Sequence, residues 1–386
     1  MNSVLFVDDN LHLLQGLKRG LRSLRAQWEM HFVASGQAAL DFLAQRSVDV
    51  VITDYRMPGM SGFELLSRIQ KDYPATVRIV LTGQPDRETY GVAIGVCHYF
   101  LWKPLDIDRL KPLLDRLAEL NGLLENPELT RNLRGLTTLP TFPEVYNQLT
   151  QVLDNPEADR QELLRLISHD ISLTMQILKM VNSAFIGLVR EISTLDETIQ
   201  YLGLNTIRSL VLAHHVFNVS VVDAVEDELR QLWEHSCTTA WLAEALVRDK
   251  GDGCLQAYTA FAGLLHDLGK LVLIHCLPEV HQQVNRLMTG QGLSRTQAEL
   301  EILGCSHAAI GAYLAQLWGL PHSVVEAIYL HHLPEITSGQ SLSEIAEATW
   351  HANRISRGDH SLSQREYQML CHYPEVKKRL ETLSRD

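Results

Sequence analysis

Short apolar runs alternate with amphipathic segments over the first 120 residues, and this alternation constrains the fold more than any other feature of the chain. The apolar runs lie at residues 4–7, 29–33, 48–53, 77–82 and 98–101, and segments with helical spacing of apolar residues lie between them. Continuous apolar runs are typical of parallel strands that helices cover on both faces. The pattern predicts a doubly wound α/β domain with a five-stranded parallel sheet, whose ligand crevice lies at the carboxyl ends of the strands.

Polar side chains gather at those predicted strand ends. Asp8 and Asp9 end the first strand, Asp54 ends the third, Thr82 ends the fourth, and Lys103 follows the fifth. Three carboxylates at one sheet edge repel one another unless a hard cation such as Mg²⁺ lies among them. A lysine and a hydroxyl at the same edge indicate that a phosphoryl group binds there. The alternative, in which each acid caps a helix, accounts for one aspartate but not for all five positions together.

Four motifs at these strand ends resemble the receiver domain of two-component response regulators. The motifs are VDD at residues 7–9, TDYRMPGMSG at 53–62, LTG at 81–83 and KP at 103–104. The resemblance covers residues 1–120 and implies a flavodoxin-like fold. It also implies that Asp54 accepts a phosphoryl group from a histidine kinase or a phosphotransfer protein.

The same resemblance implies a role for several other residues. It implies a Mg²⁺ site built from carboxylates and one backbone carbonyl, with Asp9 and Asp54 as direct ligands, Asp8 acting through water and Arg56 giving its carbonyl oxygen. Three further residues would contact the phosphoryl group or report its arrival: Thr82, Lys103 and the aromatic Phe100. A domain of this kind switches between two states and does not turn over a metabolite.

The remainder of the chain follows a different pattern. Residues 121–135 are polar, with Asn126-Pro127 as a breaker, and predict a linker, although one helix over residues 110–124 that crosses the boundary remains an alternative. Beyond them, apolar residues recur at three- and four-residue spacing. This spacing predicts an all-α domain over residues 136–335 and a smaller helical extension over residues 336–386.

Charge and cysteine content exclude several classes of protein. The first 120 residues carry 14 basic and 14 acidic side chains, whereas the rest carries 20 basic and 32 acidic ones. Such a balance disfavours nucleic acid as a partner, because no basic stripe is present to bind phosphates. No run of 18 apolar residues is present, so we expect no membrane span. The six scattered cysteines contain no CxxC pair and indicate a reduced, cytoplasmic protein.

The helical region holds 14 of the 17 histidines. Five of these histidines lie in helices or at helix ends, and an aspartate lies beside one of them. Together they form a candidate site for one or two divalent transition metals, with the aspartate bridging them. The residues are His235, His266, Asp267, His307, His331 and His332. Such a site promotes the attack of water on a phosphate ester. The alternative is that these histidines are hydrogen-bonded core residues of a helical bundle.

This arrangement resembles the HD superfamily of metal-dependent phosphohydrolases, and in particular its HDOD (HD-related output) branch. The matching stretches lie at residues 139–149, 170–184, 192–212, 264–273, 307–321 and 327–332. The resemblance implies a regulatory output module without catalysis. Two departures from the catalytic enzymes agree with this implication, because no Gly-Tyr-Pro motif follows His332, and Asn353 stands where a final metal-binding aspartate is expected.

The sequence therefore leads to two hypotheses. The first is a cytoplasmic response regulator that is phosphorylated on Asp54 and signals through a non-catalytic HDOD domain to a protein target that the sequence does not name. The second is a phosphorylation-controlled phosphodiesterase that acts on cyclic di-GMP or another nucleotide. A transcription factor is disfavoured because no basic recognition helix follows the receiver-like region. Whether the chain forms a homodimer stays open.

Overall fold

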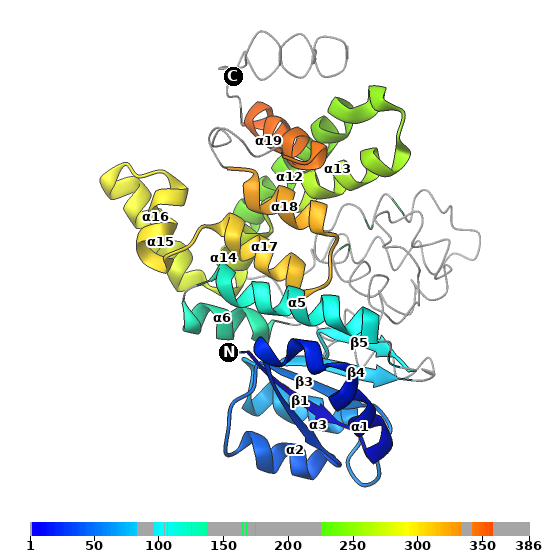
Figure 1. The fold of residues 1–386 in the computed structure, drawn as a ribbon. Helices are drawn as coiled ribbons and strands as arrows, with labels where there is room; N and C mark the ends of the chain where they lie inside the picture. The colour runs from blue at the N-terminus through cyan, green and yellow to red at the C-terminus, as the bar shows by residue number, and fades with distance from the viewer. Residues whose placement is uncertain are drawn as a thin grey trace, which may run out of the picture.

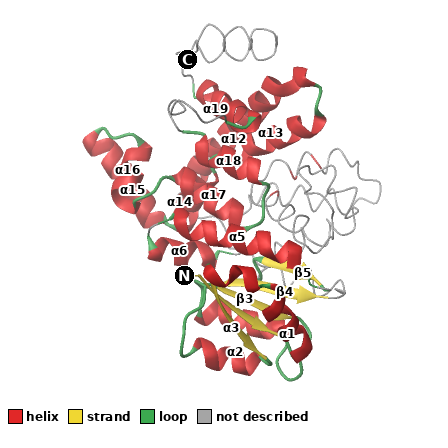
Figure 2. Cartoon of the chain, in the orientation of Figure 1, coloured by secondary structure: helices red, strands yellow, loops and turns green. Residues whose placement is uncertain are grey.

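The structure is a computed structural model, which describes residues 2–82, most of residues 96–136, residues 225–332 and residues 342–357, together with the isolated positions 164, 167 and 174. These parts form a sheet flanked by helices, followed by an all-helical region (Figures 1 and 2). Several predictions lie outside the described residues: the stretches 139–149, 170–184 and 192–212 apart from residue 174, the segment after His332, and the helical extension over residues 336–386 apart from residues 342–357.

The sheet has five parallel strands in the order β2-β1-β3-β4-β5, which confirms the predicted doubly wound sheet. The strands are β1 (Asn2–Val7), β2 (Trp28–Val33), β3 (Val50–Asp54), β4 (Val77–Thr82) and β5 (Tyr99–Trp102). Their register pairs Val7 with Thr53 and Asp54 with Leu81, so the carboxyl ends of the three central strands lie side by side.

Helices cover both faces of this sheet, because successive strand residues point to opposite sides. The helices are α1 (Leu11–Gly20), the short 3₁₀ helix η1 (Arg22–Ala26), α2 (Gly36–Leu43), α3 (Gly62–Asp72) and α5 (Ile107–Leu123). Val4 and Phe6 pack with α1 and α5 on one face, whereas Leu5 and Val7 pack with α2 and α3 on the other. A continuous apolar strand is therefore buried from both sides.

The segment predicted as a linker is mostly helical. Helix α5 runs on to Leu123, which matches the alternative of one helix across the boundary, and helix α6 (Pro127–Gly135) follows it. The Asn126 side chain accepts hydrogen bonds from the backbone N–H groups of Glu128 and Leu129, and Pro127 occupies the first turn. The Asn-Pro pair therefore starts a helix here, because Asn is a good N-cap and Pro fits the first helical position.

The described residues beyond 224 are helical, as the apolar spacing predicts. The helices are α12 (Glu226–Val247), the 3₁₀ turn η4 (Arg248–Lys250), α13 (Gly253–Leu265), α14 (Leu268–Cys276), α15 (Pro278–Gln291), α16 (Arg295–Leu303), α17 (His307–Leu317), α18 (His322–Leu330) and α19 (Glu344–Ser356). Among the described helices, none alone has the length and apolar character needed to cross a bilayer, while the pair Tyr258–Cys276 and Pro278–Gln291 meets that requirement only together, across a bend of 109°.

Helical spacing of apolar residues continues across positions 257–275, but the structure breaks the helix at His266 and Asp267 into α13 and α14. Asp267 has φ −97° and ψ 18°, outside the helical range. The ring Nδ1 of His266 lies 2.7 Å from the carbonyl oxygen of Gly263, which places this side chain against the end of α13. The break lets two consecutive side chains enter the same cluster, which an uninterrupted helix cannot do because neighbours along it point 100° apart.

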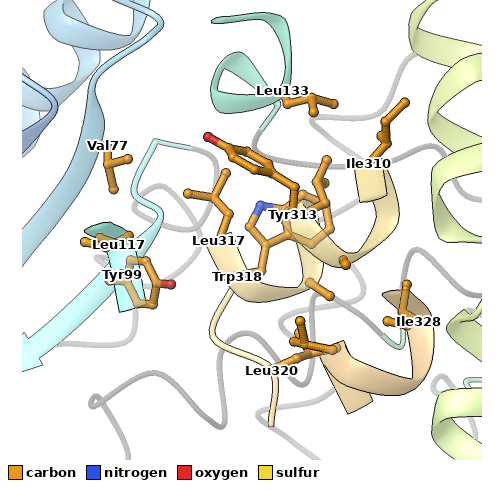
Figure 3. Packing of buried hydrophobic residues seen from close by; sticks show 14 of the residues in the cluster. Val77, Tyr99, Leu117, Leu133, Ile310, Tyr313, Leu317, Trp318, Leu320 and Ile328 are labelled. Atoms are coloured by element: carbon orange, nitrogen blue, oxygen red, sulfur yellow. The ribbon is translucent and has the colours of Figure 1, made fainter. Parts of the chain in front are cut away.

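The sheet domain and the helical region share one hydrophobic core. Leu317 and Trp318 at the end of α17 pack toward Val77 of β4, Tyr99 of β5 and Leu117 of α5 (Figure 3). Hydrogen bonds reinforce this contact: the Tyr99 hydroxyl donates to the Gln316 carbonyl at 2.7 Å, the Gln316 amide donates to the Arg116 carbonyl at 3.1 Å, and Arg134 Nε donates to the Tyr313 hydroxyl at 2.7 Å. The receiver-like face that contains β5 and α5 is therefore joined directly to α17.

Candidate functional sites

The first candidate site lies at the carboxyl edge of the sheet. Asp8 and Asp9 follow β1, and Asp54 ends β3. One carboxylate oxygen from each of the three lies within 4.8 Å of the others. Lys103, just after β5, places its ammonium 2.8 Å from Asp8 Oδ2 and 2.9 Å from Asp54 Oδ2. Thr82 is buried at the end of β4, so the five predicted positions meet at one edge.

Charge and burial oppose each other at this edge. Burial raises the pKa of Asp54, the hydrogen bond and charge of Lys103 lower it, and the charge of Asp8 raises it again, so that the net shift is upward. Burial alone would lower the pKa of Lys103, but the two carboxylates outweigh it and raise that pKa. A group of oxygen donors with excess negative charge fits Mg²⁺, which prefers oxygen ligands.

Two neighbouring backbone features hold Asp54 in place. The backbone N–H of Arg56 donates a hydrogen bond to the Asp54 carboxylate. Gly62 starts α3 so close to β3 that a Cβ at this position would meet the Asp54 carbonyl oxygen at 2.0 Å. Sequence reasoning missed Gly62 as a site residue, although it closes the TDYRMPGMSG motif. The backbone of Phe100 lies in β5, and its side chain lies outside the described residues.

The second candidate site surrounds Asp267, whose two carboxylate oxygens face different histidines. Oδ1 lies 3.4 Å from His307 Nε2 and 3.3 Å from His331 Nε2, and His332 Nε2 lies 2.9 Å from His307 Nε2. One donor atom each from Asp267, His307, His331 and His332 lies within 4.8 Å of the others. This group has the size and composition of a metal site with three imidazoles and one carboxylate.

The other oxygen of Asp267 belongs to a second group. Oδ2 lies 3.5 Å from His235 Nε2 and 3.3 Å from His266 Nε2, and the two imidazole nitrogens are 3.1 Å apart. Asn353 Oδ1 also lies 3.1 Å from His235 Nε2, and its amide nitrogen donates to the His331 carbonyl at 3.2 Å. The structure thus brings together all seven residues that the sequence indicated, in two groups that share Asp267.

Three of the imidazoles are oriented through their other ring nitrogen. His266 Nδ1 faces the Gly263 carbonyl at 2.7 Å, and His331 Nδ1 faces the Ile328 carbonyl at 2.6 Å. His307 Nδ1 lies 2.6 Å from Oε2 of the buried Glu299. Because a carbonyl or carboxylate oxygen only accepts, each Nδ1 carries a proton, so the neutral form of each imidazole has its lone pair on Nε2, which faces Asp267.

This protonation leaves buried acceptors facing each other. His331 Nε2 and Asp267 Oδ1 are both buried and, within the described part of the chain, neither has a hydrogen-bond partner. Two acceptors at this separation repel each other unless a cation lies between them, and an unsatisfied buried acceptor costs about 1–3 kcal/mol. Neutral imidazoles and one carboxylate are the donor set that a divalent transition metal binds, so the residues fit such an ion.

Burial keeps three of the imidazoles, those of His235, His331 and His332, in the neutral form that binds metals. It lowers the pKa of His235 to about 3, with the neighbouring charge of His266 acting in the same direction. Burial also lowers the pKa of His331 to about 3 and that of His332 further. Burial alone would raise the pKa of Asp267, but His266 and Lys270 hold it well below its usual value.

Two cations at this cluster were missed by sequence reasoning. Lys270 Nζ lies 2.6 Å from Asp267 Oδ2, and Arg357 Nη2 lies 3.8 Å from the same oxygen. Lys270 follows Asp267 by three residues in the HDLGK stretch, a spacing that places both on one helical face and was the available signal. Arg357 lies just after α19 and carries no pattern that sets it apart in the sequence.

A parallel sheet with an acidic edge and a facing lysine, joined to a helical domain with a histidine–aspartate cluster, defines a response regulator with an HD-like output domain. The family model of the HDOD domain matches residues 139–334, more than half of the chain, and that of the response regulator receiver domain matches residues 4–115. The chain therefore belongs to the HDOD family and carries a receiver domain. A receiver domain implies an upstream histidine kinase or phosphotransfer protein.

Known proteins are similar to parts of the chain. An uncharacterized protein of Treponema pallidum (strain Nichols) is 30% identical over 194 residues, which are 50% of this chain and 37% of that protein. A probable cyclic di-GMP phosphodiesterase of Vibrio cholerae is 35% identical over 145 residues, which are 34% of this chain and 32% of that protein. The chain thus spans less than half the length of either relative.

One solved structure is similar to about two thirds of the chain. The MmoQ response regulator of Methylococcus capsulatus (strain Bath) superposes with a TM-score of 0.53 at 21% identity, over 63% of this chain and 97% of that one. At this identity the likeness shows a shared fold.

Proposed function

We propose that the chain is a phosphorelay response regulator in which Asp54 accepts a phosphoryl group and the receiver domain controls the HDOD domain. The observation that carries the proposal is the position of Lys103 between Asp8 and Asp54, with ammonium-to-carboxylate distances of 2.8 and 2.9 Å. An Asp54 oxygen attacks the phosphorus of a donor phosphohistidine, and the P–O bond forms as the P–N bond breaks. Lys103 and the Thr82 hydroxyl then hold the phosphoryl oxygens.

The metal-binding part of this proposal uses the carboxylates at the same edge. Asp8, Asp9, Asp54 and the Arg56 carbonyl would hold Mg²⁺, which supplies positive charge to the transferred group when bound. Lys103 is already close to two of the carboxylates, so it leaves Asp8 and Asp54 partly neutralised before any phosphoryl group arrives.

Phosphorylation with acetyl phosphate and Mg²⁺ tests the assignment of Asp54. We expect the wild-type chain to gain one phosphoryl group by intact-mass spectrometry, and Asp54→Asn to gain none. Asp72→Asn is the matched control, because Asp72 is exposed at the far end of α3. Labelling that persists in Asp54→Asn would show that another residue is the acceptor.

The contact between the domains supports control of the HDOD domain by the receiver. Helix α17 begins at His307, one of the cluster histidines. Two of its later positions, Tyr313 and Gln316, form hydrogen bonds with Tyr99, Arg116 and Arg134 on the receiver side. Tyr99 precedes Phe100, whose rotamer we propose to change on phosphorylation. A shift of β5 or α5 therefore acts on the helix that carries a cluster residue.

For the output itself, we propose interaction with a downstream protein without catalysis. Support comes from Asn353, which presents a neutral amide oxygen 3.1 Å from His235 Nε2 where catalytic HD proteins place an aspartate. A neutral amide is a weaker ligand for a divalent metal than a carboxylate. The acidic balance of the helical region favours a target with basic patches.

A metal-dependent phosphohydrolase is the second candidate, and the unpartnered acceptors Asp267 Oδ1 and His331 Nε2 favour it. Divalent transition metals at the two groups would supply Lewis acidity toward a phosphate ester. The chain's own part is to hold the ions through its imidazoles and to bind the phosphate oxygens through Lys270 and Arg357. Both cations lie within 4 Å of Asp267 Oδ2.

Metal analysis together with turnover distinguishes the two candidates. Purified protein is supplied with Mn²⁺ or Fe²⁺, its bound metal is counted by mass spectrometry, and hydrolysis of cyclic di-GMP and of a nitrophenyl phosphodiester is followed. Activity that is lost in His266→Ala but kept in His322→Ala, an exposed histidine that begins α18, would establish the phosphohydrolase. Inert protein would refute it and leave the interaction module.

A further inference from the structure

A large cavity extends from the histidine cluster toward the hairpin of α15 and α16. Its volume is about 600 Å³, and the cluster residues His235, Asp267, His307 and His332 line it. Met288 and the start of α16 also line it. Cavities of about 300–1,000 Å³ hold ligands of several tens of atoms, so this one is larger than an inorganic phosphate requires.

The net charge of the cavity wall is opposite in sign to that of the whole chain. The wall contains three cationic side chains (Lys270, Arg295 and Arg357) and two anionic ones (Glu228 and Asp267). The whole chain carries a net charge of −12. Bound metals would add further positive charge. An electropositive recess in an acidic protein concentrates anions.

Arg295 carries a hydrogen-bonding group that the protein does not use. Its Nη2 donates to Asn285 Oδ1 at 3.1 Å and lies 3.8 Å from Glu228 Oε1, which fixes the guanidinium in the wall. Its Nη1 is buried and lacks a hydrogen-bond partner among the residues that the structure describes. A guanidinium that is fixed in a cavity wall and keeps an unused donor is suited to bind an oxyanion, because guanidinium groups bind oxyanions through two parallel hydrogen bonds.

The cations fall into two places within the cavity. Lys270 and Arg357 lie at the cluster, within 4 Å of Asp267 Oδ2. Arg295 lies at the start of α16, on the hairpin side, and the apolar side chains of Leu232, Ile274 and Met288 complete the wall. A ligand that matches this pattern has two anionic groups and a less polar body between them.

We propose that this cavity binds a ligand with two phosphate groups, one at the Asp267 cluster and one at Arg295. The proposal deepens the phosphohydrolase candidate and rests on it for the phosphate at the cluster. Arg295 is then the residue that selects bisphosphorylated ligands over monophosphorylated ones. It touches no cluster residue in the described structure, so it determines specificity without holding metal.

Binding of two nucleotides that differ by one phosphate tests the proposal. The full chain is titrated calorimetrically with adenosine 5′-monophosphate and with adenosine 3′,5′-bisphosphate, once after chelator treatment and once after loading with Mn²⁺. We expect the bisphosphate to bind about tenfold tighter or more in the wild type, since a charge-assisted pair is worth that much. The preference should fall below about threefold in Arg295→Gln and recover in part in Arg295→Lys, which restores the charge.

Arg286→Gln is the matched control, because Arg286 is exposed on α15 and lies outside the cavity lining. It should keep the full preference. Equal affinities for the two nucleotides in the wild type, or a preference that survives Arg295→Gln, would overturn the proposal. A protein that takes up no metal would refute only the hypothesis that the cluster binds metal. The titrations of the chelator-treated protein would still measure whether Arg295 selects the second phosphate.

Discussion

Replacement of Gly269 by alanine places a methyl group between two helices that are in backbone contact. A Cβ at residue 269 of α14 would lie 1.9 Å from the carbonyl oxygen of His307 and 2.9 Å from the backbone nitrogen of Gly311 on α17. An ordinary contact of about 3.5 Å requires the two helices to separate by about 1.6 Å at this point. Both obstacles are backbone atoms, so no side chain can rotate away.

The expected cost is about 3 kcal/mol, at the upper end of the range for overpacked cores. For a domain of this size that corresponds to a fall of about 6–12 °C in Tm. Because the clash falls on His307, the same variant should also take up less metal if the cluster binds ions. Thermal unfolding followed by circular dichroism and calorimetry measures the first effect, and mass spectrometry measures the second.

Gly290→Ala supplies the matched control, because nothing lies within 4 Å of the added Cβ in α15. Replacing a helical glycine in open space should stabilise by about 0.5–1 kcal/mol. Acetyl phosphate labelling at Asp54 should be unchanged in both variants, which checks that the receiver remains folded. A Gly269→Ala protein within about 0.5 kcal/mol of wild type would refute the close packing described for α14 and α17.

Three further predictions concern the domain contact and the buried thiols. Arg134→Ala removes the donor that lies 2.7 Å from the Tyr313 hydroxyl, and it should lower the free energy of unfolding in urea by about 1–3 kcal/mol. An equal loss of stability in Arg131→Ala, at an exposed residue of the same helix, would contradict this prediction. Burial raises the pKa of Tyr99 above its ordinary 10, so the folded chain keeps a proton that the unfolded chain loses, and stability falls as pH rises past about 10. Tyr99→Phe should lose about 1 kcal/mol at neutral pH and flatten that alkaline fall; an unchanged slope would contradict the assignment. Burial raises the pKa of Cys276 and of Cys305 to about 12, so both should resist iodoacetamide at pH 9 until urea is added, and fast native alkylation by mass spectrometry would contradict this.

The receiver domain was largely predictable because its strands are buried on both faces. Runs such as residues 77–82 are then buried throughout and mostly apolar, and parallel strands must align their carboxyl ends. Once Asp8, Asp54 and Lys103 were placed at strand ends, the topology alone brought them together. The role of Gly62 was not predicted, because it allows a close approach of two backbones, and such an approach leaves no side-chain pattern in the sequence.

The helical cluster was predictable in membership but not in geometry. Histidine and aspartate stand out against apolar helices, so His266 and Asp267 could be picked from the sequence. The break between α13 and α14 could not, because the residues on either side keep helical spacing. Lys270, Arg295 and Arg357 were missed for a related reason, since a single cation on a helix is ordinary until the fold shows which cavity it enters.

The packing of Leu317 and Trp318 against Val77 and Tyr99 also bears on how a protein of this kind is taken apart or recombined. Separation of the receiver from the helical region would expose large apolar side chains on the surfaces of both parts (Figure 3). A foreign receiver grafted onto these helices would have to bring α5, α6 and a hydroxyl at the place of Tyr99 with it. An exchange of domains therefore has to carry both sides of this contact, whereas substitutions on the exposed surface of the receiver leave the contact in place.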